Sequence, residues 1–244
     1  MIRLLGVLLW IVPATSWFGG RMIWAVFRGS PDVRCICRES PRGWARQLLW
    51  LSGVDVVIEN LDVIDSERPQ ILVANHSSWY DVLVLLSVPG TSLFVAKKEL
   101  SRVPIFGRAI GGCGHIFIDR QDRNAAVQSL AGARELLEKE SPTIIMFPEG
   151  TRTRTGELQR FKKGAFVLAI QTGVEVVPAA IIGSRDVMRK GSLRIRPGTI
   201  TLRFGVPIPV EGLGMDDRNE LTEQARTAVR DLQADATRTD RKNI

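Results

Sequence analysis

Residues 71–81 have the sequence ILVANHSSWYD, and the fold can be worked out from this stretch. The run from Ile71 to Ala74 is apolar and rich in branched side chains, which predicts a buried strand. Ser78 and Asp81 have the spacing of a capping box, so we expect a helix to start at Ser78. His76 then lies in the turn that joins the strand to the helix.

The spacing of His76 and Asp81 suggests how the two side chains relate. Within one helix, residues five positions apart point in different directions. If His76 instead precedes the helix, the Asp81 carboxylate can fold back toward one imidazole nitrogen and leave the other free to take a proton from a substrate hydroxyl. The alternative interpretation is that Asp81 only caps the helix and His76 has no chemical role.

Composition indicates a packed protein with an anionic partner. The chain has 244 residues, of which 45% are hydrophobic, enough for one sizeable domain and an appendage. Its formal charge of +7 suits nucleic acid, an acidic membrane surface or a phosphorylated substrate. A single Tyr and no basic tract interleaved with aromatic residues argue against nucleic acid. Six Trp and a long apolar start favour anionic membrane lipids.

The cysteines and histidines suggest neither disulfides nor a metal. Cys35, Cys37 and Cys113 cannot all pair with one another, and Cys35-x-Cys37 is a poor span for a bridge or a zinc site. We therefore expect a reducing compartment. A lone His–Asp pair lacks a third metal ligand, so we expect no metal and no cofactor.

Residues 1–53 are predicted to be a membrane-associated helical segment. Leu4 to Gly20 carries no charge, but Pro13 and the Gly19-Gly20 pair weaken a continuous helix, which leaves open a spanning helix and a half-buried anchor. A signal peptide fits more loosely. Six arginines follow the apolar run within this segment and only Arg3 precedes it, which places the rest of the chain on the cytoplasmic face of the inner membrane.

Two further segments have open interpretations. Residues 43–51 (GWARQLLWL) predict a short amphipathic helix that lies either in the membrane interface or against the domain. The histidine outside the decisive stretch, His115, occupies a predicted strand position, and we expect it to be structural.

Residues 54–234 alternate between predicted strands and helices without a repeat or a linker. This pattern predicts a single α/β domain with a mixed, mostly parallel central sheet flanked by helices, followed by a polar tail at 235–244. We expect a helix over Asn124–Glu140 and a hairpin that pairs Leu193–Ile195 with Thr199–Phe204. The residues that directly follow predicted strands should gather at one edge of the sheet; they are His76, Lys98, Arg120 and Glu149.

The segment after the strand at 143–147 is basic and rich in glycine and hydroxyl groups. Between Arg152 and Lys163 five cationic side chains face a single acid, Glu157. Guanidinium forks and backbone N–H groups are suited to a phosphate, although a solvated charged loop has the same composition. Lys98, Arg108 and Arg120 add further cations.

In order and spacing, the motifs of this chain resemble the four blocks of the glycerolipid acyltransferase family, closest to its bacterial 1-acylglycerol-3-phosphate acyltransferases. The resemblance covers roughly Val54 to Pro209. It rests on Asn75-His76-x-x-x-x-Asp81, Phe117-Ile118-Asp119-Arg120, Phe147-Pro148-Glu149-Gly150-Thr151-Arg152 with Phe161-Lys162-Lys163-Gly164, and Val177-Pro178.

The resemblance implies a general-base acyl transfer. His76, oriented by Asp81, would deprotonate the hydroxyl of lysophosphatidic acid, which attacks an acyl thioester on coenzyme A or acyl carrier protein and forms phosphatidic acid. An oxyanion hole would come from backbone N–H groups near Gly150 or at the helix start after His76. The residues implied to hold the acceptor are Lys98, Arg108, Arg120, Glu149, Gly150, Thr151 and Arg152.

Two alternatives remain open beside this activity. Ser101 stands where the family often has Phe, so the acceptor pocket can differ, and another lysolipid such as a lyso-ornithine lipid is a second candidate acceptor. The other alternative is a membrane-surface lipid-binding protein without catalysis. An intact His76 and Asp81 argue against it, because lipid binding alone does not require that pair.

Overall fold

The computed structural model describes residues 2–65, 68–89, 93–119, 132–133, 137 and 143–240. Arg120 and nearly all of the helix expected at Asn124–Glu140 lie outside these residues. The described helices are α1 (Ile2–Phe27), α2 (Val33–Ser52), η1 (Leu61–Val63), α3 (Tyr80–Ser87), η2 (Lys98–Arg102), α4 (Phe106–Gly112), α6 (Gly164–Thr172), α7 (Ser184–Val187) and α8 (Arg218–Asp240). The strands are β1 (Val54–Glu59), β2 (Gln70–Ala74), β3 (Leu93–Lys97), β4 (Ile116–Ile118), β5 (Thr143–Met146), β6 (Val176–Ile182) and β7 (Gly198–Phe204).

The strands form one sheet in the order β1-β7-β6-β2-β5-β3-β4. Neighbouring strands are parallel except for β6 and β7, which are antiparallel. The mixed, mostly parallel sheet of a single α/β domain is therefore confirmed. The carboxyl ends of β2 and β5 lie side by side, because these two strands are paired in register from Gln70 to Val73.

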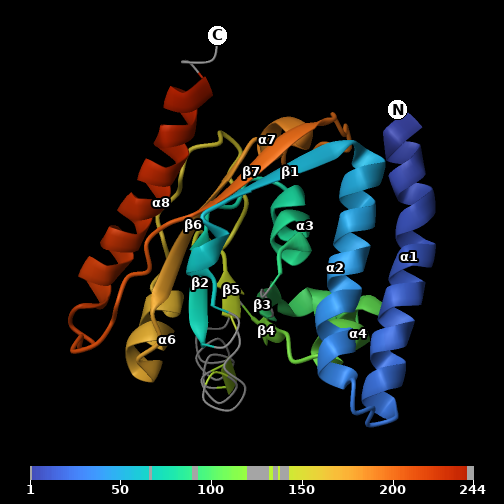
Figure 1. Ribbon diagram of the computed structural model, residues 1–244, viewed down its shortest axis with the longest axis horizontal. Coiled ribbons are helices and arrows are strands. Elements are labelled where there is room, and N and C mark those ends of the chain that lie inside the picture. Colours follow the sequence, from blue (N-terminus) through green and yellow to red (C-terminus); the bar gives the residue numbers. More distant parts are fainter. Residues whose placement is uncertain are drawn as a thin grey trace.

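The central strand β2 is buried along its whole length, as expected for a parallel strand covered on both faces. Ile71 and Val73 face a core cluster that includes residues of α6 and α8, whereas Leu72 and Ala74 face a second cluster with residues of α2 and α3. Figure 1 shows this layering, with α6 and α8 on one side of the sheet and α3, α2 and α1 on the other.

The predicted hairpin is wrong. Leu193–Ile195 forms no strand, and β7 instead pairs in parallel with β1 and antiparallel with β6. The alternating residues Ile200, Leu202 and Phe204 of β7 are fully buried. The position of β7 between β1 and β6 buries the face that carries these three residues. Pairing with a three-residue segment at the surface would not bury it.

Helices α1 and α2 run antiparallel beside the domain (Figure 1). Neither Pro13 nor the Gly19-Gly20 pair interrupts α1, which has 26 residues and a length of roughly 39 Å. Gly19 serves close packing, because a Cβ there would come within 2.8 Å of the Ile105 side chain. Within the described residues, Arg3–Phe27 is the one stretch long and apolar enough to cross a membrane, and most of it is exposed.

Residues 43–51 belong to the longer helix α2. Its Leu48 and Leu49 are buried in the core cluster shared with α3, so this face packs on the domain. Trp50 is 78% exposed. Tyr80 of α3 reinforces the contact, since its hydroxyl lies 2.6 Å from the Ser52 hydroxyl.

The expectation of unpaired cysteines is wrong for two of the three. Cys37 of α2 and Cys113 at the end of α4 form a disulfide with a Cα–Cα distance of 5.5 Å, and Cys35 is free and exposed. The partners are 76 residues apart in sequence, so the local Cys35-x-Cys37 spacing carried no information about the pairing. The bridge fastens α4 to the helical pair.

Candidate active site

Asn75 ends β2 and fixes the direction in which the chain leaves the sheet. Its amide group donates to the Ile181 carbonyl oxygen at 2.8 Å and accepts from the Ile181 N–H at 2.7 Å. The side chain thus extends the pairing of β2 with β6 by one rung, while the backbone turns away. His76 is delivered to the carboxyl edge of the sheet, where open α/β folds bind their ligands.

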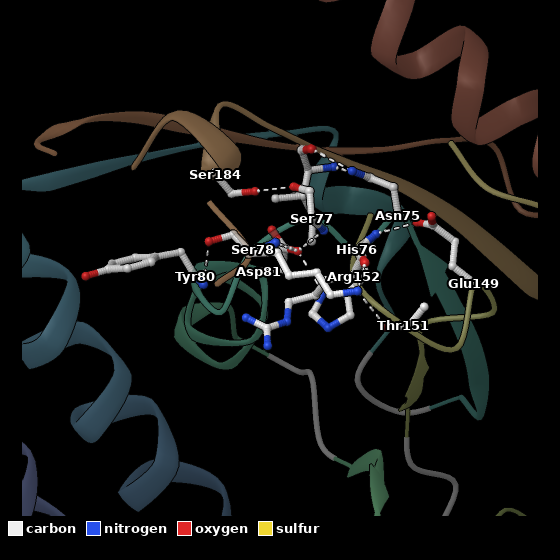
Figure 2. A network of polar contacts seen from close by, with 12 residues as sticks. Asn75, His76, Ser77, Ser78, Tyr80, Asp81, Glu149, Thr151, Arg152 and Ser184 are labelled. Carbon is white, nitrogen blue, oxygen red and sulfur yellow. Dashed lines mark hydrogen bonds and ion pairs between the residues drawn. The ribbon is translucent and has the colours of Figure 1, made fainter. Parts of the chain in front are cut away.

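His76 and Asp81 contact each other directly (Figure 2). The His76 Nδ1 lies 2.8 Å from Asp81 Oδ2, which also accepts from the N–H groups of Ser77 at 2.6 Å and Ser78 at 2.8 Å. Asp81 is fully buried. A carboxylate oxygen can only accept here, so Nδ1 carries the proton and the ring's Nε2 is left as the basic nitrogen.

The helix after His76 starts two residues later than predicted, at Tyr80. Ser78 caps it from outside, because its hydroxyl accepts from the Tyr80 N–H at 3.2 Å. Asp81 reaches back to the Ser78 N–H, as in a capping box. Asp81 therefore caps the helix and orients His76 at the same time. The sequence had left these two roles open as alternatives.

The loop after β5 holds the backbone of His76 at both ends. The His76 N–H donates to Glu149 Oε1 at 2.6 Å, and the His76 carbonyl oxygen accepts from the Thr153 N–H at 2.8 Å. The His76 ring also stacks on Phe147, with 4.1 Å between ring centroids. These contacts leave the ring little freedom to rotate away from Asp81.

Glu149 supports this arrangement from inside the protein. Its two oxygens accept from the N–H groups of His76 and Gln159, and the side chain is 4% exposed. Burial raises the pKa of Glu149, and the hydrogen bonds from the two N–H groups oppose that rise. The resemblance had implied that Glu149 holds the acceptor. The structure instead turns its oxygens toward the backbone, and a carboxylate would repel a phosphate.

Arg152 and Thr151 lie at the end of β5 beside His76 (Figure 2). The Arg152 guanidinium carbon lies over the Trp79 ring, 5.4 Å from its centroid. Gly150 makes the turn possible, with a φ of +74° that a residue with a Cβ rarely adopts. The loop therefore presents a guanidinium group near the imidazole on an aromatic support.

Lys190 is a residue of this site that no sequence motif indicated. Its Nζ donates to Thr151 Oγ1 at 3.1 Å and to the Arg152 carbonyl oxygen at 2.6 Å. The residue follows β6 and is 38 positions from Arg152, so no local motif connects it to the site. The same contacts bring a second positive charge next to Arg152.

The segment after β6 also holds the turn that carries His76. Ser184 and Ser77 lie with their hydroxyl oxygens 3.0 Å apart, and the Ser78 hydroxyl donates to the Met188 carbonyl oxygen at 2.7 Å. Residues 184–190 thus fasten the His76 turn and the Arg152 loop to each other.

A cavity of about 500 Å³ opens beside His76. At one end lie His76, Gly150, Thr151 and Arg152. Most other walls are apolar and come from α1, α2, α3 and α4; they include Phe18, Met22, Trp44, Val82, Leu86, Phe106, Ala109 and Ile110. An apolar cavity with a few polar groups at its mouth is the usual form of a site for a hydrophobic ligand.

Two further predicted site residues, Lys98 and Arg108, are not brought to the cavity. Lys98 is exposed and lies 3.3 Å from Asp119, and Arg108 is exposed on α4. Neither lines the cavity, whereas the neighbouring Lys97 does. Across the described part of the chain, no group of three or more His, Cys, Asp or Glu side chains is arranged to hold a metal ion.

Comparison with known proteins agrees with this geometry. The family described as Acyltransferase matches residues 55–182. A 1-acyl-sn-glycerol-3-phosphate acyltransferase of Cocos nucifera is 35% identical over 73% of this chain and 58% of its own length. The human 1-acyl-sn-glycerol-3-phosphate acyltransferase alpha is 32% identical over 76% of this chain and 68% of its own length. The chain thus spans only part of these relatives.

A solved structure matches nearly the whole chain. The 1-acyl-sn-glycerophosphate (LPA) acyltransferase of Thermotoga maritima superposes with a TM-score of 0.78 at 30% identity, over 95% of this chain and 96% of that one. The match includes the N-terminal helices as well as the sheet, because so little of either chain is left out. By its sequence blocks, its fold and its relatives, the chain belongs to the acyltransferase family.

Proposed function

We propose that the protein transfers an acyl chain from a thioester donor to the free hydroxyl of 1-acylglycerol 3-phosphate and forms phosphatidic acid. One observation carries this proposal: the imidazole held by Asp81 stands at the polar end of a large apolar cavity, beside Arg152. The names of the relatives point to the same substrate. The donor is acyl-CoA or acyl carrier protein.

The chemistry needs one base and no covalent enzyme intermediate. His76 Nε2 takes the proton of the acceptor hydroxyl while the oxygen attacks the thioester carbonyl carbon. The C–S bond then breaks, and the imidazolium returns the proton to the leaving thiolate. Asp81 keeps the ring in the required tautomer and stabilises its charged form. Holding the hydroxyl and the thioester next to each other supplies much of the remaining rate.

The acceptor phosphate is placed at Arg152, which lines the cavity, and at the neighbouring Lys190, which does not line it but contacts Thr151 and the Arg152 backbone. An arginine fork and a lysine ammonium together suit a phosphate dianion. The backbone N–H groups of Thr151 and Arg152 are the candidate oxyanion donors. The other expected donors are occupied, because Gly150 donates to the Phe147 carbonyl and the N–H groups after His76 donate to Asp81.

The site is proposed to work at a membrane surface. Helix α1 carries exposed Leu9, Trp17 and Phe27 on its outside and contributes Phe18 and Met22 to the cavity wall. An acyl chain in the cavity therefore contacts the same helix that meets the lipid. We place the domain on the cytoplasmic face of the inner membrane from the arginines after the apolar run alone, because the Cys37–Cys113 bridge removes the support that unpaired cysteines gave to a reducing compartment.

The test is acylation by the purified full-length chain in detergent or lipid vesicles. Lysophosphatidic acid and a labelled acyl-CoA should yield phosphatidic acid, and His76→Gln should lose nearly all of the rate with an unchanged circular dichroism spectrum. A parallel reaction with lyso-ornithine lipid tests the second acceptor. Full activity of the His76→Gln variant would refute the mechanism, and binding of lipid without turnover by the wild type would favour a lipid-binding protein.

A further inference from the structure

His115 lies in the wall of the cavity, far from His76. It directly precedes β4, which is three strands from β2 in the sheet, or roughly 14 Å at the usual strand spacing. A row of rings connects the two histidines: His76 to Phe147 at 4.1 Å, Phe147 to Phe94 at 6.4 Å, and Phe94 to His115 at 6.2 Å between centroids. His115 and His76 thus line the same cavity at two separate places.

The position of the proton on His115 follows from its contacts. Its Nδ1 lies 3.1 Å from the Phe94 N–H and accepts from it, so Nδ1 carries no proton. The residue is 8% exposed, and burial lowers the pKa of His115 to about 4. The ring is therefore neutral at physiological pH, and its single proton is on Nε2.

Within the part of the chain that the structure describes, His115 makes one side-chain hydrogen bond, through Nδ1, and none through its Nε2–H group. The ring lines the cavity, so the Nε2–H group is open to a ligand there. The nearby wall is formed by apolar side chains such as Val95, Ala109 and Ile110. An entirely hydrocarbon ligand in the cavity would cover this N–H group without offering it an acceptor, which costs free energy.

We propose that His115 Nε2–H donates to an oxygen carried by the acyl chain, so that the cavity selects donors whose chain bears a hydroxyl or keto group. This inference rests on the proposed function and names the class of acyl donor for the same site. The hydroxyl or keto oxygen accepts the hydrogen bond while the methylenes around it contact the apolar wall. His115 acts in chain selection and takes no part in proton transfer, because the reacting bond lies at the other end of the cavity.

The test uses a panel of acyl-CoA donors of one chain length. One donor is unsubstituted, and each of the others carries a single hydroxyl at a successive carbon along the chain. With lysophosphatidic acid as acceptor, the wild type should show kcat/KM about tenfold higher for the donor whose hydroxyl reaches His115, as one neutral hydrogen bond predicts. Donors with the hydroxyl elsewhere should be used less well than the unsubstituted chain.

Two variants distinguish the effect of the His115 N–H group on selectivity from any effect of the substitution on folding. His115→Phe removes the N–H, and the ratio of kcat/KM between the favoured hydroxylated donor and the unsubstituted donor should fall below one. His115→Gln retains an acceptor for the Phe94 N–H and a donor for the ligand, so it should keep a preference at the same or a neighbouring carbon. Circular dichroism of both variants reports whether they fold.

The outcomes distinguish the inference from the proposed function. A wild type that uses the unsubstituted donor as well as every hydroxylated one would overturn the inference, since bound water then satisfies Nε2–H. A preference that survives in folded His115→Phe would overturn it too. Failure to acylate lysophosphatidic acid with any donor would count against the proposed function instead.

Discussion

Glu149 Oε1 accepts a 2.6 Å hydrogen bond from the backbone N–H of His76, and this bond joins the two motifs of the site across 73 residues of sequence. The imidazole is therefore positioned through its backbone by one acid and through its ring by another. Asp81 acts on the ring nitrogen, whereas Glu149 acts on the turn that carries the ring.

Replacing Asp81 by Asn should lower kcat by roughly a thousandfold or more, an effect of the size seen when an orienting acid is removed from a Ser-His-Asp triad. The amide nitrogen of Asn either faces the N–H groups of Ser77 and Ser78 or turns the imidazole to the wrong tautomer. Steady-state acylation kinetics measure the loss. Asp62→Asn, at an exposed acid in η1, is the matched control and should keep the wild-type rate.

Replacing Glu149 by Gln should change how stability depends on pH. Burial raises the folded-state pKa of Glu149, so the wild type loses part of its stability as the pH rises from the ordinary carboxyl range through that raised value. Gln does not ionise and should remove this part of the dependence, while the lost hydrogen bond to Gln159 costs about 1–3 kcal/mol. Urea unfolding at a series of pH values measures both, and an unchanged pH profile would contradict the prediction.

Replacing Arg152 by Ala or Lys190 by Met should raise KM for lysophosphatidic acid more than it lowers kcat, by roughly tenfold for each cation. The defect should be smaller at low salt, where the remaining cation is less screened. Arg154→Ala is the control, because that exposed side chain lies on the same loop away from the cavity. A defect confined to KM for the acyl donor would show that the phosphate binds elsewhere.

Replacing Cys37 or Cys113 by Ser should destabilise the oxidised protein. A bridge that closes a loop of this length contributes roughly 4 kcal/mol in the chain-entropy description. Thermal unfolding with and without a reductant measures the effect, and Cys35→Ser should leave the unfolding temperature unchanged. If reductant does not lower the unfolding temperature of the wild type, the bridge does not stabilise the fold.

Replacing His115 by Gln should make the protein more tolerant of acid. The folded-state pKa of His115 is about 4, below its ordinary value, so the wild type loses stability as the pH falls from about 6.5 toward 4. The loss attributable to this residue reaches about 3 kcal/mol. Urea unfolding between these pH values should show a steeper decline for the wild type than for the variant, and parallel curves would mean that His115 protonates freely in the folded protein.

The centre of the fold and the His76–Asp81 pair could be predicted from the sequence, because both depend on short-range patterns. An apolar run marks β2, and a five-residue spacing is close enough for the turn to bring the two side chains together. The loop with Arg152 was found for the same reason, since its glycine, hydroxyls and cations are contiguous.

The features that could not be predicted from the sequence depend on packing between segments that are distant in the chain. Lys190 reaches Thr151 only because β6 lies beside β2, and Cys113 reaches Cys37 only because α4 packs on the helical pair. The partner of β7 was wrongly predicted because Pro197-Gly198, which lies between the two segments of the expected hairpin, suggested a local turn. The buried alternation of Ile200, Leu202 and Phe204 instead required neighbouring strands on both sides.

The contribution of α1 to the cavity wall has a practical consequence for the production of this protein. Trimming the first 27 residues to gain solubility would remove Phe18 and Met22 and leave the fatty-chain compartment open along one side. With α1 as the proposed membrane anchor, such a truncated enzyme should lose both its selectivity for acyl chains and its attachment to lipid. On that proposal a single helix serves both attachment and chain selectivity, and mutations on its outer or its inner face should affect one or the other.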